Sequence, residues 1–322
     1  MVVETLIVGG GVAGLSTGLH LAREGHETAI LEAGLQYGLA TRASAGIVSA
    51  QLVRNTPRSV LRRLGRDVGT RLLEAVAASA SSVFDLVREE DLACDASQSG
   101  FIAPFSRHTE QWKETVDAWS SLRSDVTLLD RDDTASLTGC VGYAGAILDR
   151  SGGALDPAAY ADSLATTASR YGARLFCDTT ALHITPARTG ATRWAVTHER
   201  GVVYARNVVL AANGANAGFH PRLRHLVVPL SVLEVATEPL SAGMRARVLP
   251  KGHVLTDLST DVFSIRYDAH GRLITAAPAL GAAAERSAIA AHVNARFADM
   301  IPGWEPPPIS FGWVGPAWLF GA

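Results

Sequence analysis

Cysteine is scarce in this chain, and its few cysteines lie far apart. The 322 residues contain three, Cys94, Cys140 and Cys177, and none belongs to a Cys-x-x-Cys pair. The sequence therefore predicts neither a cysteine-based zinc site nor a dithiol redox motif. Scattered thiols without a pairing pattern are typical of proteins in a reducing compartment.

Long apolar runs and clusters of one charge are missing as well. No apolar stretch approaches the roughly 20 residues that a membrane-spanning helix needs. The first apolar segment begins almost at the first residue, which leaves no room for a signal peptide. We therefore expect a soluble cytoplasmic protein. The formal net charge is −2 without a long run of either sign, so nucleic-acid binding is not indicated.

Several motifs that mark catalytic machinery are also absent. The sequence contains no Gly-x-Ser-x-Gly nucleophile elbow, no His-Glu-x-x-His zinc motif and no phosphate-binding P-loop. The ten histidines are scattered along the chain. No metal site and no acid–base pair is therefore predicted.

What the sequence does have is a glycine motif at its amino terminus. A predicted strand over 5–8 is followed by Gly9, Gly11 and Gly14 at the G-x-G-x-x-G spacing of dinucleotide-binding turns. The first glycine permits the turn, the second lets a pyrophosphate approach the backbone, and the third packs the following helix against the strand. That helix would direct its free N–H groups at the pyrophosphate. The predicted residues of this site are Gly9, Gly11, Val12, Ala13 and Gly14.

An acidic residue stands where such a nucleotide unit needs it. A second apolar strand, Thr28–Leu31, ends directly before Glu32. A carboxylate at this place can accept a hydrogen bond from a ribose hydroxyl and would repel a 2′-phosphate. The alternative interpretation is a buried strand-turn-helix with an incidental surface Glu32. Glu32 by itself suits FAD and NAD equally.

Length and composition predict two domains. A chain of 322 residues with 48% hydrophobic content can bury a large core. Apolar periodicity and turn residues predict helices over about 57–90, 158–171 and 283–300. They predict strands over about 174–177, 181–184, 194–197, 202–204, 207–210, 231–236, 262–267 and 272–276.

In this order, the segments resemble the flavoprotein oxidoreductases of the D-amino-acid oxidase superfamily. This superfamily includes glycine, sarcosine and γ-glutamylputrescine oxidases and D-amino-acid dehydrogenases. The matching pieces cover nearly the whole chain. Apart from the glycine motif at the amino terminus, no single piece is specific, but their order is. The pieces are 9–14 with Glu32, the small-residue loop 44–48, and the stretches 149–157, 208–214 and 266–273.

The resemblance implies an α/β fold with FAD as the cofactor. A Rossmann-like FAD-binding domain with a parallel sheet would use about 1–75 and 150–216. A substrate domain, α+β with a mixed sheet, would use about 76–149 and 217–312, so both domains are discontinuous. The flavin ring would lie between them. The resemblance adds further cofactor-binding residues, which are Ser44, Ala45 and Gly46 beside the flavin and Ala212 and Gly214 after the second nucleotide strand.

The implied reaction is oxidation of the C–N bond of an amine or amino acid by hydride transfer to flavin N5. The cofactor carries the difficult chemistry in such enzymes, so no acid–base pair is demanded. The candidate catalytic residues are Arg42, beside the flavin loop, and Arg266 and Tyr267 on a hairpin of the substrate domain. An arginine can hold a carboxylate with two hydrogen bonds. Strand alternation allows only one of Arg266 and Tyr267 to face the pocket.

The chain also departs from the family pattern. Family members continue beyond the Trp-x-Gly element, here 313–315, with a glycine-rich turn and a helix that faces the pyrimidine end of the flavin. Here 313–322 would be a truncated return to the FAD domain, and we expect weak flavin retention. The loop 37–49 contains no histidine, so a covalent histidyl-flavin link is not expected there. The alternatives are a weakly active or non-catalytic flavin-binding remnant and an NAD-dependent dehydrogenase. No feature of the sequence indicates an oligomeric state.

Overall fold

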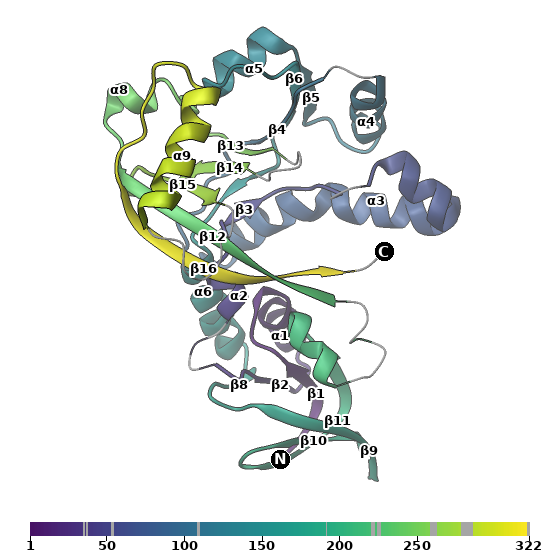
Figure 1. Ribbon diagram of the computed structural model, residues 1–322. Coiled ribbons are helices and arrows are strands. Elements are labelled where there is room, and N and C mark those ends of the chain that lie inside the picture. The colour runs from purple at the N-terminus through teal and green to yellow at the C-terminus, as the bar shows by residue number, and fades with distance from the viewer. Residues whose placement is uncertain are drawn as a thin grey trace.

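The computed structural model shows two large sheets with helices packed around them (Figure 1). It describes residues 1–322 except 35, 37, 53, 54, 108, 109, 191, 220–222, 224–226, 258–262, 278–285, 321 and 322. Within these described residues, no helix is both long and apolar enough to cross a membrane.

The first sheet carries the glycine turn. Its strands are β1 (Val2–Val8), β2 (Thr28–Leu31), β8 (Arg174–Phe176), β9 (Ala181–Thr189), β10 (Thr192–His198) and β11 (Gly201–Leu210). Their order is β8-β2-β1-β11-β10-β9. The first four strands in this order are parallel to their neighbours, and β9, β10 and β11 are antiparallel neighbours. The sheet is thus parallel where the glycine turn lies and antiparallel at one end.

Burial explains the local structure of this sheet. Leu6, Ile7 and Ile30 are fully buried, as expected for parallel strands that are covered on both faces. The helices α1 (Val12–Arg23) and α6 (Pro157–Arg170) cover one of these faces. Leu15 of α1 and Leu164 of α6 pack with Ile7 and Ile30 in one core cluster. The apolar side chains that recur in the sequence at helical spacing therefore form the contact between helix and sheet.

The second large sheet forms the upper part of the molecule in Figure 1. Its strands are β4 (Phe101–Phe105), β5 (Val126–Leu129), β6 (Gly145–Asp149), β12 (Val227–Pro239), β13 (Val254–Asp257), β14 (Phe263–Tyr267), β15 (Arg272–Ala277) and β16 (Ile309–Phe320). Their order is β16-β12-β15-β14-β13-β4-β6-β5. The helix α9 (Arg286–Met300) covers one face, where Phe297 packs with Val235, Ile265 and Leu273. The opposite face is directed towards the first sheet.

The remaining elements lie between these strands along the chain. They are α2 (Leu39–Arg42), β3 (Ile47–Val48), α3 (Pro57–Glu89), α4 (Glu110–Ser120), α5 (Arg131–Thr138), β7 (Gly153–Ala154), η1 (Asn213–Gly218) and α8 (Ala242–Arg245). The Thr56 side chain caps α3 by accepting a hydrogen bond from the Ser59 N–H, and the helix is interrupted at Gly65, where φ is 74°. β3 and β7 pair with each other. This short pair lies beside the small-residue segment that the sequence assigns to the flavin.

The predicted fold class, an α/β protein with a parallel nucleotide sheet and a separate mixed sheet, is confirmed. The predicted strand at Thr28–Leu31 is also confirmed, and the helix predicted over 158–171 is α6. The start of α6 is fixed by Asp156, whose side chain accepts from the N–H groups of Ala158 and Ala159. The helix predicted over 283–300 is described from Arg286 onward, since 283–285 lie outside the described residues. The domain boundaries stay a prediction.

Several strands have no counterpart among the predicted strand ranges, and the longest of them is β16. Residues 309–320 form β16, which pairs along β12 from Thr237 back to Val227. Glycine and proline at Gly312, Gly315 and Pro316 are unusual inside a strand, which hides the segment from a pattern-based search. β16 is an edge strand, where a proline is tolerated. Part of the segment predicted as a return to the FAD domain, 313–320, therefore extends the second sheet.

Candidate functional site

A cleft of about 670 Å³ opens where the glycine turn after β1 meets the start of α1. The end of β2, helix α2, residues 179–182 and the segment after β11 complete its walls. The predicted cofactor residues that line it are Gly9, Gly11, Val12, Ala13, Glu32 and Ala212. We refer to this space as the nucleotide cleft.

The three motif glycines have different structural roles. A Cβ on Gly9 would lie 2.6 Å from the carbonyl carbon of Ala211, and a Cβ on Gly14 would lie 1.9 Å from the carbonyl oxygen of Gly9. These two positions need glycine because backbone atoms occupy the space. A Cβ on Gly11 would meet only the Thr41 hydroxyl, at 3.5 Å. Gly11 is therefore open on the side where a ligand can approach.

The amino terminus of α1 is suited to an anion. Gly11 is the N-cap residue and has no side chain that could cap the helix, and the first turn contains no acidic residue. The Val12 N–H donates to the Thr41 hydroxyl at 3.1 Å, so one of the first N–H groups already has a partner. The other N–H groups of the first turn and the positive end of the helix dipole together favour a phosphate. The sequence analysis missed Thr41, because a threonine in a short irregular segment carries no periodic signal.

Glu32 is already engaged by the backbone. Its Oε2 accepts from the Gly10 N–H at 2.6 Å, and its Oε1 accepts from the Gly34 N–H at 2.8 Å. The carboxylate thus ties the glycine turn to the segment after β2. Each carboxylate oxygen keeps a second lone pair with which it can accept from a ribose hydroxyl. Glu32 can therefore hold the loop and a nucleotide together.

The predicted site residues after β11 separate into two kinds. Ala212 lines the nucleotide cleft, and its N–H donates to Asn216 Oδ1 at 3.0 Å. Gly214 is buried in η1 and is not among the lining residues. The segment is a short 3₁₀ helix rather than the simple glycine turn that the sequence predicts, and the Asn216 side chain holds its start. Ala212 and Gly214 are therefore close in sequence but different in exposure to the cleft.

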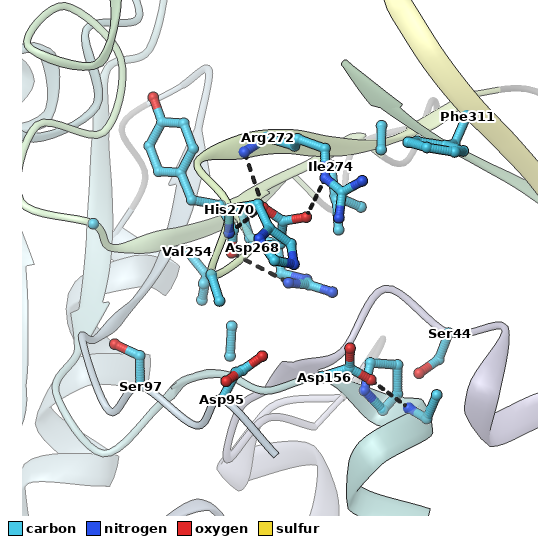
Figure 2. A pocket seen from close by; sticks show the side chains of 18 of the residues that line it. Ser44, Asp95, Ser97, Asp156, Val254, Asp268, His270, Arg272, Ile274 and Phe311 are labelled. Carbon is cyan, nitrogen blue, oxygen red and sulfur yellow. Dashed lines mark hydrogen bonds and ion pairs between the residues drawn. The ribbon is translucent and has the colours of Figure 1, made fainter. Parts of the chain in front are cut away.

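A second cleft, of about 540 Å³, lies between the second sheet and the segments around 42–44, 95–99 and 154–158, and we call it the interdomain cleft. In Figure 2, Ser44, Asp95, Ser97 and Asp156 lie on one side, and Val254, Asp268, His270, Arg272, Ile274 and Phe311 lie opposite. The predicted catalytic residues Arg42, Arg266 and Tyr267 all line it. The structure therefore brings Arg42 to the same cleft as Arg266 and Tyr267, which lie far from it in the sequence.

Arg266 is the buried cation of this cleft. Arg266 is 5% exposed. Its Nε donates to the Ala45 carbonyl, and its Nη1 donates to the Tyr267 carbonyl at 3.2 Å. Burial lowers the pKa of its guanidinium, and the nearby Asp268 acts in the opposite direction. Among the described residues Arg266 forms no ion pair. A buried guanidinium without a paired anion is suited to a carboxylate ligand.

Tyr267 is directed to a different environment. Its hydroxyl donates to the Val248 carbonyl at 2.8 Å, and its ring packs against the core cluster under α9. Burial raises the pKa of this hydroxyl. Adjacent residues of a strand face opposite sides of the sheet, and here Arg266 contacts the segment at Ala45 while Tyr267 contacts the core. The Tyr267 hydroxyl is thus committed to a structural hydrogen bond.

The other cations of the interdomain cleft are paired. Arg42 Nη1 donates to Asp162 Oδ1 on α6 at 2.6 Å. Arg272 Nε donates to Asp268 Oδ2 at 2.7 Å, and its guanidinium lies 5.1 Å from the ring centre of Phe311. Within the described part of the chain, no group of three or more His, Cys, Asp or Glu could hold a metal ion.

The small-residue segment predicted beside the flavin lies between the two sheets. Ser44 lines the interdomain cleft, the Ala45 carbonyl accepts from Arg266, and the Gly46 carbonyl accepts from the Leu155 N–H at 2.9 Å. Gly46 has a φ of +69°, and a Cβ there would lie 2.3 Å from the Leu155 carbonyl oxygen. Close backbone packing therefore explains why this segment consists of small residues.

Two further side chains near this segment were not predicted from the sequence. Trp313 lines the interdomain cleft, and its Nε1 donates to the Ala43 carbonyl at 3.0 Å. Glu234 pairs directly opposite Trp313 in the ladder between β12 and β16 and is 4% exposed. An acidic residue within the apolar strand 231–236 was the available signal for Glu234.

Comparison with known proteins identifies a family and several relatives. The family described as "FAD dependent oxidoreductase" matches residues 4–318. γ-Glutamylputrescine oxidoreductase of Escherichia coli strain K12 is 24% identical, over 97% of this chain and 73% of that protein. The probable oxidoreductase OrdL of Rhizobium meliloti is also 24% identical, over 97% of this chain and 72% of that protein.

Solved structures show the same fold. Glycine oxidase from Geobacillus kaustophilus superimposes with a TM-score of 0.74 at 21% identity and covers 98% of this chain and 83% of that chain. L-Proline dehydrogenase from P. horikoshii superimposes with a TM-score of 0.75 at 17% identity, over 98% of this chain and 81% of that chain.

Proposed function

The chain belongs to the family of FAD-dependent oxidoreductases, and from this premise we propose that it oxidises the C–N bond of an amine or amino acid. Relatives named for γ-glutamylputrescine, glycine and L-proline support a substrate of this class. The proposal makes the nucleotide cleft the site of the FAD dinucleotide and the interdomain cleft the site of the substrate.

The nucleotide cleft fits FAD. Gly11 leaves open space beside the amino terminus of α1, so the N–H groups at that terminus would hold the pyrophosphate. Glu32, with a free lone pair on each oxygen, would accept from the adenosine ribose. The segment Ser44, Ala45 and Gly46 would lie beside the flavin, where its small side chains permit close approach. Bound FAD supplies the electron acceptor for the reaction.

The observation that carries the proposal is the buried guanidinium of Arg266 in the interdomain cleft, which forms no ion pair within the described part of the chain. It would hold a substrate carboxylate with two hydrogen bonds. The Ala45 carbonyl, which accepts from Nε, fixes the guanidinium relative to the flavin segment. A substrate held in this way would lose its α-hydrogen as hydride to flavin N5, and its C–N bond would become an imine that water hydrolyses. Arg42, paired with Asp162, would contribute positive charge at the cleft wall.

The test begins with purified protein and added FAD. We expect a flavin absorption spectrum that is bleached without oxygen by members of a panel of glycine, sarcosine, D-alanine, L-proline and putrescine. Arg266→Gln should lower kcat/KM for carboxylate-bearing substrates by at least about tenfold, the effect of losing one charge-assisted interaction. Arg200→Gln, at an exposed arginine paired with Asp178, is the matched control. A flavin spectrum that no amine or amino acid bleaches would refute the proposed reaction.

A further inference from the structure

Glu234 is a buried acid that the proposed reaction does not yet use. The residue is 4% exposed, and its Oε2 has no hydrogen-bond partner among the described residues. Burying a carboxyl group is costly unless a partner compensates for the lost water. A buried carboxyl oxygen without a partner therefore indicates that a ligand supplies one when the site is filled.

The register of the sheet places Glu234 on the face that forms the interdomain cleft. Ile274 pairs with both Arg266 and Ala236, and these three residues line the cleft. Glu234 shares that face because it lies two residues from Ala236 along β12. It also pairs with Trp313, which lines the cleft and donates to the Ala43 carbonyl. The acid is therefore on the sheet face that carries these lining residues, one row beyond Ala236 and directly opposite Trp313.

The charges around Glu234 leave it available to a cation. Burial raises its pKa from 4.5 to about 7, and Arg266 acts in the opposite direction. Its direct cross-strand partners, Ala276 on β15 and Trp313 on β16, are uncharged. The facing segment, residues 43–46, contains no titratable side chain. Arg266 on β14 is thus the charged group that bears on Glu234, and no ion pair joins the two among the described residues.

We propose that Glu234 receives the amino group of the substrate, so that Glu234 and Arg266 together select a zwitterionic amino acid. This inference rests on the proposed function. The two residues lie two strands and two residues apart, about 12 Å at the usual strand spacing and rise, and their long side chains can converge on the two ends of one small molecule. Arg266 takes the carboxylate, and Glu234 takes the ammonium group.

The same contact prepares the substrate for oxidation. An ammonium group has no free electron pair to support the loss of hydride from the neighbouring carbon. The Glu234 carboxylate accepts one ammonium proton, so that an N–H bond breaks, an O–H bond forms, and the N–H electron pair stays on nitrogen. The neutral amine can then lose its α-hydrogen as hydride. A carboxyl whose pKa is near neutral is suited to this transfer.

The test uses two ligands of the same shape. Betaine (trimethylglycine) and 3,3-dimethylbutanoate both carry a carboxylate, but only betaine carries a cation. We measure the affinity of FAD-saturated protein for each by calorimetry. We expect wild type to prefer betaine by at least about tenfold, and Glu234→Gln to remove this preference while 3,3-dimethylbutanoate still binds. Glu238→Gln, at an exposed residue of the same strand, should leave the preference unchanged.

Wild-type protein supplies a second measurement that needs no variant. The preference for betaine should fall as the pH is lowered through about 7, because Glu234 becomes neutral, whereas Arg266 stays charged. Two results would overturn the inference: an equal fall in the affinity of Glu234→Gln for both ligands, or a wild type that binds both ligands equally well. Glu234 would then be a residue that positions Arg266. A betaine preference that depends on Glu234 supports the inference even if the amine panel shows no oxidation, so the two proposals can fail separately.

Discussion

The nucleotide cleft and the interdomain cleft are built in opposite ways. The nucleotide cleft depends on backbone geometry within one short stretch, residues 9–14, and on Glu32 shortly after it. The interdomain cleft depends on side chains from distant segments, such as Arg42, Asp156, Arg266 and Phe311. A site made of backbone requires glycine at fixed spacing and is therefore visible in a sequence. A site made of side chains depends on strand register, because a slip of one residue turns each side chain to the other face.

The strongest test of the local, backbone-built site is Gly14→Ala. The added Cβ would lie 1.9 Å from the Gly9 carbonyl oxygen, and a backbone clash cannot be relieved by rotating a side chain. We expect the free energy of unfolding to fall by at least about 3 kcal/mol, the upper part of the range for overpacking. Urea denaturation measures this, with Gly243→Ala, where a Cβ meets no atom within 4 Å, as the control. Equal stability of the two variants would contradict the assigned role of Gly14.

Gly11→Val separates binding from folding in the same turn. The new side chain enters open space, since a Cβ there meets only Thr41 Oγ1 at 3.5 Å. We expect thermal stability to be nearly unchanged and the FAD dissociation constant to rise by at least about 100-fold, or about 3 kcal/mol. Circular dichroism and an FAD titration measure the two quantities. Unchanged FAD affinity would refute the placement of the pyrophosphate.

The buried acid of the interdomain cleft predicts a pH-dependent stability. Burial raises the pKa of Glu234 from 4.5 to about 7 in the folded protein, so the fold favours the protonated form. The contribution of the protonated acid to the free energy of unfolding is complete below pH 4.5 and is lost as the pH rises past 7. Glu234→Gln stays neutral, and we expect the ligand-free variant to be more stable than wild type at alkaline pH by up to about 3 kcal/mol. Unfolding curves at several pH values measure the difference, and a difference that does not vary with pH would count against the buried-acid interpretation.

Glu32→Ala tests how one side chain serves both the loop and the ligand. The change removes a carboxylate that accepts from the N–H groups of Gly10 and Gly34. We expect FAD binding to weaken by about 2 kcal/mol, the scale of a hydrogen bond to a charged group. Glu27→Ala, at an exposed acid paired with Arg174, is the control in the FAD titration. An FAD affinity equal to that of the control would show that Glu32 does not contact the nucleotide.

The smallest expected effect concerns Tyr267→Phe. The variant loses one hydrogen bond, from the hydroxyl to the Val248 carbonyl, which should lower the free energy of unfolding by about 1 kcal/mol. Because that hydroxyl is directed at the core, we expect kcat and KM to stay close to wild type, in contrast to Arg266→Gln. Steady-state kinetics on the best substrate of the panel, together with denaturation, measures both. A large fall in kcat with unchanged stability would return Tyr267 to the catalytic residues.

The sequence predicted the nucleotide unit more completely than the substrate site. The strand, the glycine turn, the helix and Glu32 are neighbours in sequence, and local propensity and spacing determine their geometry. Arg266 and Arg42 were found as candidates, but the contacts of Arg266 with Ala45 and of Arg42 with Asp162 were not predicted. Glu234 was missed because a single acid in an apolar strand has meaning only when its sheet neighbours are known. The strand β16 was missed because its own residues carry no clear strand pattern, and the segment is a strand because it pairs with β12.

The sequence by itself determined the glycine turn, the acid that follows it and the α/β character of the chain. These features depend on interactions between residues that are close along the chain. Only the tertiary structure decided that Arg266 faces the segment at Ala45 while Tyr267 faces the core, and that Glu234 shares the sheet face of the residues that line the interdomain cleft. The physical reason is that strand pairing, set by the packing of the whole sheet, decides to which face each side chain is directed.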